Sequence, residues 1–289
     1  MLQKVPGLKM ISENIVLSSL KESFLIIKKN KRIFLLIFVL QVLFFSLIIM
    51  ANAYYMPQIL QSTQDAIDYA ESLDISPQNV NIGILQQKNP LGDDPLLIRR
   101  NYDLIMKNSI ILLILIFLIF VVINGLVWYF ASNISEKGKR LFLLKNLLSY
   151  LLEFFAVALV LSAFLYIFSY SLVNIAFSSY LSVKPINFVP LLLITAIAVY
   201  YIYISIPILD KIKFRSLAKK SFSIGTKNFI PVIISCLVIL MLIILSFLLI
   251  FYLLELNLFL LLIAVLLCIF VFAWSKIYFS IVVRKLSGL

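Results

Sequence analysis

The sequence predicts an all-α, multi-pass membrane protein with six transmembrane helices and both termini in the cytoplasm. Three observations predict it: 63% of the 289 residues are hydrophobic, only 13% are charged, and six stretches are long enough to cross a bilayer. A soluble domain contains about 45–50% apolar and about 25% charged residues, so no water-soluble core could bury this much apolar surface. The composition therefore excludes soluble, disordered and disulfide-framework proteins.

The six crossings follow from the length of the apolar runs. A helix needs about 20 mainly apolar residues to span roughly 30 Å of hydrocarbon. The segments that meet this length are residues 33–53, 109–131, 147–174, 188–209, 230–254 and 257–283. The last two divide one long run, because Glu255 and Asn257 are the polar interruption near its middle. Residues 33–289 thus form a membrane domain, in which backbone groups must be bonded within helices rather than open strands.

Lysine and arginine set the orientation. All but five of the 25 cationic residues lie in the N-terminal flank, in alternate loops and at the C-terminal end. The five on the other side are Lys88, Arg99, Arg100, Lys107 and Lys184. Because cytoplasmic loops carry the excess of cations, both termini are predicted to lie in the cytoplasm. The net charge of +12 then reflects contact with anionic lipid headgroups of the cell membrane, not with nucleic acid.

The first crossing has an alternative interpretation as a cleaved signal peptide, since Ala51-Asn52-Ala53 has the small-x-small form of a cleavage site. Its apolar core, residues 33–50, is longer than the ~7–15 residues of such peptides, which favours a retained helix. The excess of Lys over Arg and the frequent Ile, Asn and Phe are typical of an AT-rich, prokaryotic genome.

A basic amphipathic stretch precedes the first crossing and recurs before the fifth. In residues 1–32, apolar side chains recur at helical spacing and predict an elbow helix in the inner interface. These side chains are Leu17, Leu20, Phe24 and Ile27. Residues 21–24 align with residues 219–222, and Asn30 and Asn228 each follow seven residues after the aligned serine. With a shorter basic segment at residues 136–145, the chain reads as three units of elbow plus hairpin. The alternative is that any interfacial basic helix has this composition.

The second amphipathic stretch resembles the elbows of prokaryotic six-helix membrane proteins. The resemblance lies in residues Lys219 to Phe229, which read Lys-Lys-Ser-Phe-x-x-Gly-x-x-Asn-Phe. These include poorly characterised families and the membrane domain joined to some glycerophosphodiester phosphodiesterases. The elbows and six helices are also similar, more distantly, to permease subunits of ABC exporters. The resemblance implies architecture only, because the matching residues include no catalytic residue.

Residues 54–108 form the predicted outer loop. A helix from about Gln58 to Asp74 is expected to lie on the outer membrane surface as a small cap, and Ser76-Pro77 is expected to end it. Its apolar side consists of Ile59, Leu60, Thr63, Ala66, Ile67, Ala70 and Leu73. The acidic turn at Asp93 and Asp94 does not match the spacing of a calcium-binding loop. The cap is interpreted as a lid or as a docking site for a partner.

Polar side chains within the crossings are the candidate site residues. They are Glu153, Ser162, Tyr166, Tyr170, Asn174, Tyr200, Tyr201 and Tyr203. Ionisable groups are costly inside a membrane and are functional candidates by default; Glu153 is the clear case. The third and fourth crossings are expected to face each other across a groove for a lipid headgroup or a small amphiphile, or to hydrogen-bond to each other. Gln41 and Asn124-Gly125 suggest positions of close packing or hydrogen bonding, and Lys276 is expected to snorkel to the cytoplasmic interface.

Several absences narrow the chemistry. The chain has no histidine, its two cysteines have no Cys-x-x-Cys spacing, and seven glycines leave no phosphate-binding loop. No catalytic residue, metal or cofactor is therefore expected. The leading interpretation is a non-enzymatic scaffold or accessory subunit of the cytoplasmic membrane, with lipid, other membrane proteins or further copies of itself as partners. The alternative is a transporter or permease subunit for a lipid-like or small amphiphilic substrate.

Overall fold

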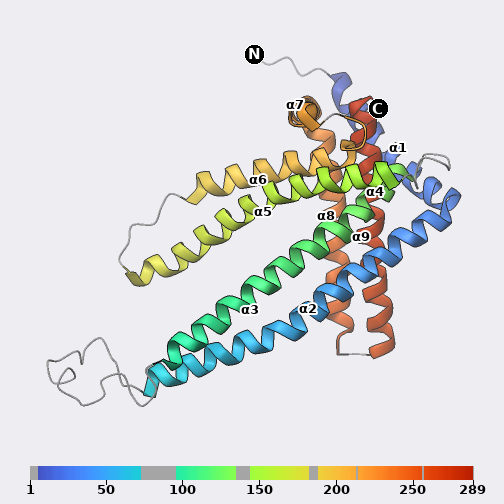
Figure 1. The fold of residues 1–289 in the computed structure, drawn as a ribbon. Helices are drawn as coiled ribbons and strands as arrows, with labels where there is room; N and C mark the ends of the chain where they lie inside the picture. The colour runs from blue at the N-terminus through green and yellow to red at the C-terminus, as the bar shows by residue number, and fades with distance from the viewer. Residues whose placement is uncertain are drawn as a thin grey trace. The chain divides into compact units, whose positions relative to one another are not determined.

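The computed structural model describes residues 6–72, 96–134, 144–181, 188–212, 214–255 and 257–288. Every regular element in these ranges is a helix, which confirms the all-α class (Figure 1). The elements are α1 (Pro6–Lys29), α2 (Lys31–Ser72), α3 (Leu97–Ile119), η2 (Phe120–Asn124), α4 (Gly125–Asn133), α5 (Leu144–Leu181), α6 (Phe188–Ser205), η3 (Ile206–Ile208), α7 (Phe214–Lys227), α8 (Phe229–Leu253) and α9 (Leu258–Ser287).

Five helical segments are long and apolar enough to cross a membrane. They are Lys31–Tyr69, Leu97–Asn133, Asn146–Tyr170, Phe229–Leu253 and Leu258–Ser287. Each contains or overlaps one of the predicted crossings. The apolar part of the fourth predicted crossing, Leu193–Ile208, is shorter than the other five.

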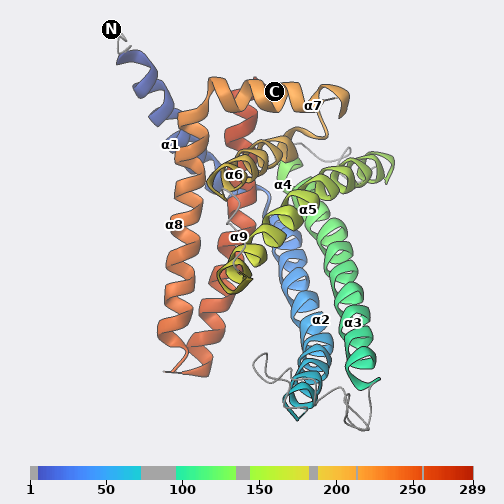
Figure 2. The ribbon, with the colours of Figure 1, turned by 90° about the vertical axis from the view of Figure 1, so that its left-hand side faces the viewer.

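The chain divides into two compact units, each described by itself. The main unit comprises Met1–Val42 and Val121–Leu289, and the hairpin unit comprises Leu43–Phe120. In the main unit α9 contacts α1, α4, α7, α8 and η3. Helices α8 and α9 run side by side (Figure 2) and are joined at the predicted polar interruption, where the Asn257 side chain accepts a hydrogen bond from the Phe259 backbone N–H at 2.8 Å. That contact is an N-cap, which satisfies one of the free donors of the first turn.

The core of the main unit lies around the C-terminal half of α9. Residues 273–283 of this helix are all buried. The Trp274 ring stacks on Phe24 of α1 at 5.6 Å and on Tyr278 at 5.1 Å, and its indole N–H donates to the Ser23 hydroxyl at 3.0 Å. Aromatic stacking and a satisfied indole donor therefore attach α1 to α9.

The two predicted elbows have the same local geometry. The backbone N–H of Asn30 donates to Ile26, four residues back, and the carbonyl of Asn30 accepts from the residue four ahead. Asn228 repeats both bonds, with Ile224 and Val232. Figure 2 shows α7 running across the end of α8, so the chain bends at Asn228. The aligned Lys-Asn pairs thus mark equivalent helix boundaries.

Burial follows the same alignment. Ser23 in α1 and the aligned Ser221 in α7 are buried, whereas the next residues, Phe24 and Phe222, are exposed. The packed face of α1 contains Val16, Ser19 and Ser23 rather than the larger apolar residues. Leu17, which was predicted on the interfacial side, is exposed. Small side chains line the most buried side of α1 because they permit close helix approach, while the larger Phe24 packs on Trp274 with about half of its surface exposed.

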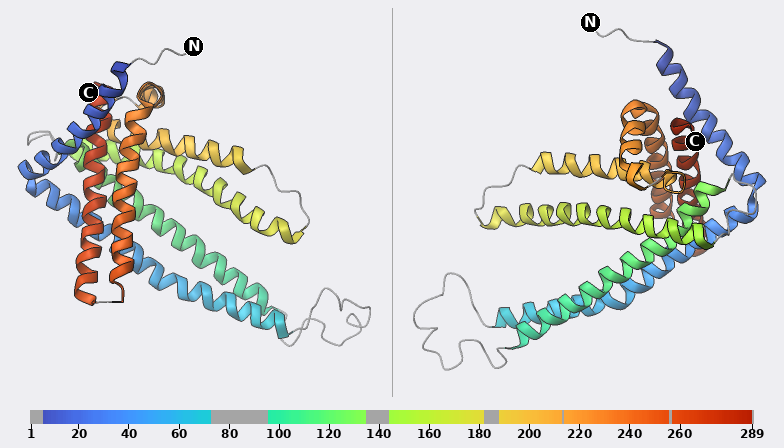
Figure 3. Two further views of the ribbon diagram at one scale, coloured as in Figure 1. Left: turned by 180° about the vertical axis from the view of Figure 1, so that it is seen from behind. Right: turned by 45° about the horizontal axis from the view of Figure 1, so that its top comes forward.

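The predicted separate cap helix is not found. Helix α2 continues from Lys31 to Ser72 without a break, and Pro57 lies inside it. In the hairpin unit, α2 and α3 run side by side (Figures 1 and 3), and the Asn108 amide donates to the Gln58 side chain at 3.3 Å. The helix expected from Gln58 is therefore the end of α2. The expected stop at Ser76-Pro77 and the acidic turn at Asp93 and Asp94 lie outside the described residues.

A single π-helical turn, η2, separates α3 from α4 at the predicted Asn124-Gly125 position. A Cβ at Gly125 would lie 2.9 Å from Leu151 and 3.1 Å from Phe154 of α5. Glycine at this position thus permits the close approach of α4 and α5, which agrees with the close packing expected from the sequence. Such π-turns re-aim the following side chains and often occur at functional sites.

Candidate functional site

A pocket of about 470 Å³ opens in the main unit between α5, α6, α8 and α9. Its lining residues are Leu165, Phe168, Thr195, Ala196, Val199, Tyr200, Tyr203, Cys236 and Phe279. Its wall combines smaller side chains, at Thr195, Ala196 and Cys236, with the aromatic rings of Phe168, Tyr200, Tyr203 and Phe279. A volume of this size is typical of a small-molecule site, and the mostly apolar lining suits an apolar ligand.

Two of the three predicted tyrosines of α6 line this pocket, and all three are fixed by neighbouring helices. The Tyr200 hydroxyl donates to the backbone carbonyl of Gly225 in α7 at 3.0 Å. The Tyr203 ring lies 5.5 Å from Trp128 and 4.3 Å from Phe279. Tyr201 packs against Phe222 at 5.1 Å. The pocket wall on α6 is therefore held in place by α4, α7 and α9.

The predicted polar face of α5 does not line the pocket. Helices α5 and α6 are neighbours, as expected, but Leu165 and Phe168 face the space between them. Tyr166 and Tyr170 are 69% and 60% exposed and stack on each other at 6.4 Å. The expected groove between the tyrosines of α5 and α6 is thus replaced by a more apolar pocket, because the 3.6-residue period puts positions 165 and 168 on a different face from 166 and 170.

Two further candidates of α5, Ser162 and Glu153, are not among the pocket-lining residues. Ser162 is half-buried and is not a lining residue. Glu153 is half-buried, and it takes part in none of the ion pairs among the described residues. The side chain of Asn174 lies outside what the structure describes. Ser162 and Glu153 are therefore not assembled with the α6 tyrosines into one site.

A buried lysine forms a second polar centre, which sequence reasoning missed. The Lys276 ammonium donates to the side-chain oxygens of Gln41, at 2.7 Å, and of Asn124. It also lies 5.9 Å from the Trp128 ring centre, a cation–π geometry. Because only 8% of Lys276 is exposed, the expectation that it snorkels to the interface is wrong.

The position of Lys276 in the sequence could have revealed that it does not lie at the membrane interface. Arg284 and Lys285 lie in the last turn of α9, so Lys276 lies more than two turns deeper and cannot share their position. The expectation of hydrogen-bonding roles for Gln41 and Asn124 is confirmed. Amide oxygens on two helices thus satisfy a cation on a third, which locks the beginning of α2 and the η2 turn onto α9.

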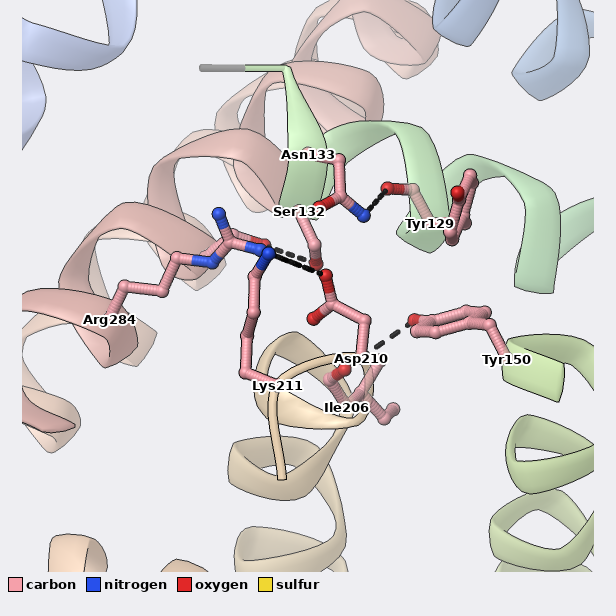
Figure 4. A network of polar contacts seen from close by, with 9 residues as sticks. Tyr129, Ser132, Asn133, Tyr150, Ile206, Asp210, Lys211 and Arg284 are labelled. Carbon is pink, nitrogen blue, oxygen red and sulfur yellow. Dashed lines mark hydrogen bonds and ion pairs between the residues drawn. The ribbon is translucent and has the colours of Figure 1, made fainter. Parts of the chain in front are cut away.

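A third polar cluster joins α4, α5, η3 and α9 (Figure 4). The Asp210 carboxylate accepts from Arg284 at 3.5 Å and lies 3.4 Å from the Lys211 ammonium. The Tyr150 hydroxyl donates to the carbonyl of Ile206 at 3.4 Å. In the same cluster, Ser132 and Ser280 hydroxyl oxygens lie 3.3 Å apart. This arrangement pairs one acid with two cations.

Metal-binding geometry is absent from the part of the chain that the structure describes. No group of three or more Cys, Asp or Glu side chains there is placed to hold a metal ion. Cys236 and Cys268 are both free thiols, on α8 and α9 respectively.

Comparisons with protein-family models, with curated proteins and with solved structures found no match to this chain. The fold by itself defines the class: an all-helical protein with five helices long and apolar enough to cross a membrane, which indicates a multi-pass membrane protein.

Proposed function

We propose that the chain spans the cytoplasmic membrane of a prokaryotic cell six times, with both termini in the cytoplasm. Five crossings are the long apolar helices, and the sixth is α6 with its η3 extension. At 1.5 Å per residue, Phe188–Ile208 is about 30 Å long, which matches the hydrocarbon thickness. The distribution of cations supports the orientation. In this topology α1 and α7 are the cytoplasmic elbows, whose lysines contact anionic headgroups.

Within this topology the protein acts as a non-enzymatic accessory subunit or scaffold that binds a lipid-like or small amphiphilic molecule. The observation that carries this proposal is the pocket of about 470 Å³ between α5, α6, α8 and α9. Among the lining residues that the structure describes, only Thr195, Tyr200 and Tyr203 carry hydroxyl groups, and none of these described residues is charged. Such a wall favours the hydrocarbon part of a ligand, since a charged ligand group buried there would lack a partner.

Filling the pocket tests this proposal. Ala196→Trp places an indole at the pocket wall and is expected to abolish photocrosslinking of a diazirine-labelled phospholipid to the α5–α6 pocket residues, as mapped by peptide mass spectrometry. The matched control is Ala163→Trp, on an exposed position of α5 that does not line the pocket. This control is expected to leave crosslinking within about two-fold of the unchanged protein. Equal labelling in both variants would show that the lipid does not occupy the pocket.

A transporter or permease subunit for the same class of molecule is the second candidate, because the pocket lies between helices proposed to cross the membrane. The two candidates differ in one measurable property. A permease accelerates the passage of a short-chain fluorescent lipid between the leaflets of proteoliposomes, and Ala196→Trp slows it. An accessory subunit binds the lipid without accelerating its passage.

A further inference from the structure

The hairpin unit extends well beyond a bilayer. Helix α2 has 42 residues, so it is about 63 Å long, roughly twice the hydrocarbon thickness. The helical segment Leu97–Asn133, with 37 residues, is about 55 Å long. In the proposed topology, on which this inference rests, residues 54–72 and 97–108 therefore form a two-helix stalk on the outer side of the membrane.

The register of the stalk is set by two contacts. The rings of Phe44 and Phe120 lie 6.5 Å apart, and the side chains of Gln58 and Asn108 are hydrogen-bonded. Continuing this antiparallel register places Leu60 level with Met106 and Ile67 level with Ile98. This register shows which residues of α2 and α3 lie at the same height above the membrane.

Each stalk helix carries an exposed apolar stripe. On α2 the stripe contains Met56, Leu60 and Ile67, of which Leu60 is 61% and Ile67 46% exposed. On α3 it contains Ile98, Tyr102 and Met106, all exposed. Large apolar side chains gathered on one extramembrane face are unusual on a soluble surface and mark an interaction site.

Both stripes lie on the same side of the stalk. Ser62 and Asn101 are buried, so they define the sides of α2 and α3 that face each other. At about 100° per residue, the stripe on α2 lies roughly 120–160° from Ser62, and the stripe on α3 lies roughly 60–140° from Asn101 in the same sense of rotation. In an antiparallel pair, rotations of the same sense from the line of contact lead to the same side, so the two stripes together form one apolar face.

Charge identifies the occupant of this face. The stalk part of α2 carries the exposed acids Asp65, Asp68 and Glu71, whereas that of α3 carries three exposed cations, Arg99, Arg100 and Lys107, and one exposed acid, Asp103, and is net basic. Copies of this chain cross the membrane in one orientation, so their stalks meet level and in parallel. A two-fold axis along the membrane normal then puts the acidic α2 of one copy beside the basic α3 of the other.

We propose that the protein forms a homodimer through this face, in which two stalks pack as a four-helix bundle outside the membrane. The apolar stripes form the core of the bundle. Glu71 of α2 and Arg99 of α3 lie at its edges within about one turn of the same depth, so they form a complementary pair between the copies. The outer segment is thus a self-association site rather than a cap on the lipid surface.

Single cysteines test the face. In a Cys236→Ser, Cys268→Ala background, Leu60→Cys is expected to give a crosslinked dimer with a short bis-maleimide in membranes. Gln61→Cys, the adjacent exposed residue on the other side of α2, is the matched control and is expected to give none. Crosslinking at both positions, at neither, or only at Gln61 would overturn the proposal, as would capture of a different protein through Leu60→Cys.

The same cysteines separate this proposal from the topology. Gln61→Cys, which the proposed dimer leaves exposed, is expected to react with a membrane-impermeant maleimide in intact cells. If Gln61→Cys reacts and Leu60→Cys gives no dimer, only the dimer is contradicted. If Gln61→Cys does not react, the segment is not outside, and the topology and the dimer are both contradicted.

Charge reversal shows which helices are neighbours. Glu71→Arg in one tagged copy and Arg99→Glu in a second, differently tagged copy are expected to co-purify with each other about three- to ten-fold more than each does with itself. A pair within one chain would be disrupted in both copies and could not produce this preference. Equal self- and cross-association would contradict the arrangement.

Discussion

Replacing Lys276 with Ala is expected to lower the free energy of unfolding by about 2–4 kcal/mol. The change leaves the buried side-chain oxygens of Gln41 and Asn124 without their shared donor, and an unsatisfied buried polar group costs about 1–3 kcal/mol. It also removes side-chain packing beside Trp128. Reversible unfolding of the purified protein in mixed micelles, followed by circular dichroism, measures the change.

Two control variants show whether the stability lost in Lys276→Ala comes from its hydrogen bonds or from the lost side-chain volume. Lys285→Ala removes an exposed ion pair to Glu22 and is expected to cost less than about 1 kcal/mol. Replacing Lys276 with Met together with Gln41→Leu and Asn124→Leu is expected to recover most of the loss, because no buried polar group then lacks a partner. A cost for Lys276→Ala no larger than that for Lys285→Ala would contradict the proposed role of this cluster.

Replacing Gly225 with Val is expected to destabilise the protein by about 1–3 kcal/mol through overpacking. A Cβ at this position would lie 2.7 Å from Tyr201, 3.0 Å from Tyr200 and 3.0 Å from Ile204. Valine has a better helix propensity than glycine, so a loss of stability identifies the clash between α6 and α7. The same unfolding measurement applies, and lipid photocrosslinking is expected to fall because Tyr200 lines the pocket.

The adjacent Thr226→Val is the matched control for this variant, since Thr226 is exposed on the same helix. It is expected to change stability by less than about 0.5 kcal/mol, as is usual for surface positions. Adding Tyr201→Ala to Gly225→Val is expected to restore part of the loss, because it removes the nearest clashing ring. If Gly225→Val were as stable as Thr226→Val, the close approach of α6 and α7 would be wrong.

Hydropathy predicted the helical class and the position of most apolar helices because each signal is local. The division at Glu255 and Asn257 coincides with the link between α8 and α9, and the aligned Asn30 and Asn228 coincide with helix boundaries. The continuity of α2 through Pro57 could not be predicted in this way. Apolar periodicity is the same in one helix as in two collinear ones, and proline normally argues for a break.

The candidate site was less predictable because its contacts join distant parts of the chain. Lys276 is 235 residues from Gln41 and 152 from Asn124, so each polar residue is visible in the sequence but its partners are not. The packed face of α5 was missed for a different reason. In a membrane the side facing lipid is as apolar as the side facing protein, so hydropathy does not reveal that Leu165, rather than Tyr166, lines the pocket.

The proposed topology is tested most directly by the accessibility of α7 from outside the cell. A Lys227→Cys variant in the cysteine-free background carries its thiol at the exposed end of this helix. We expect a membrane-impermeant maleimide to label it only after the cells are permeabilised, whereas Gln61→Cys is labelled in intact cells. Labelling of Lys227→Cys in intact cells would contradict the topology on which the pocket's membrane location and the external stalk both depend.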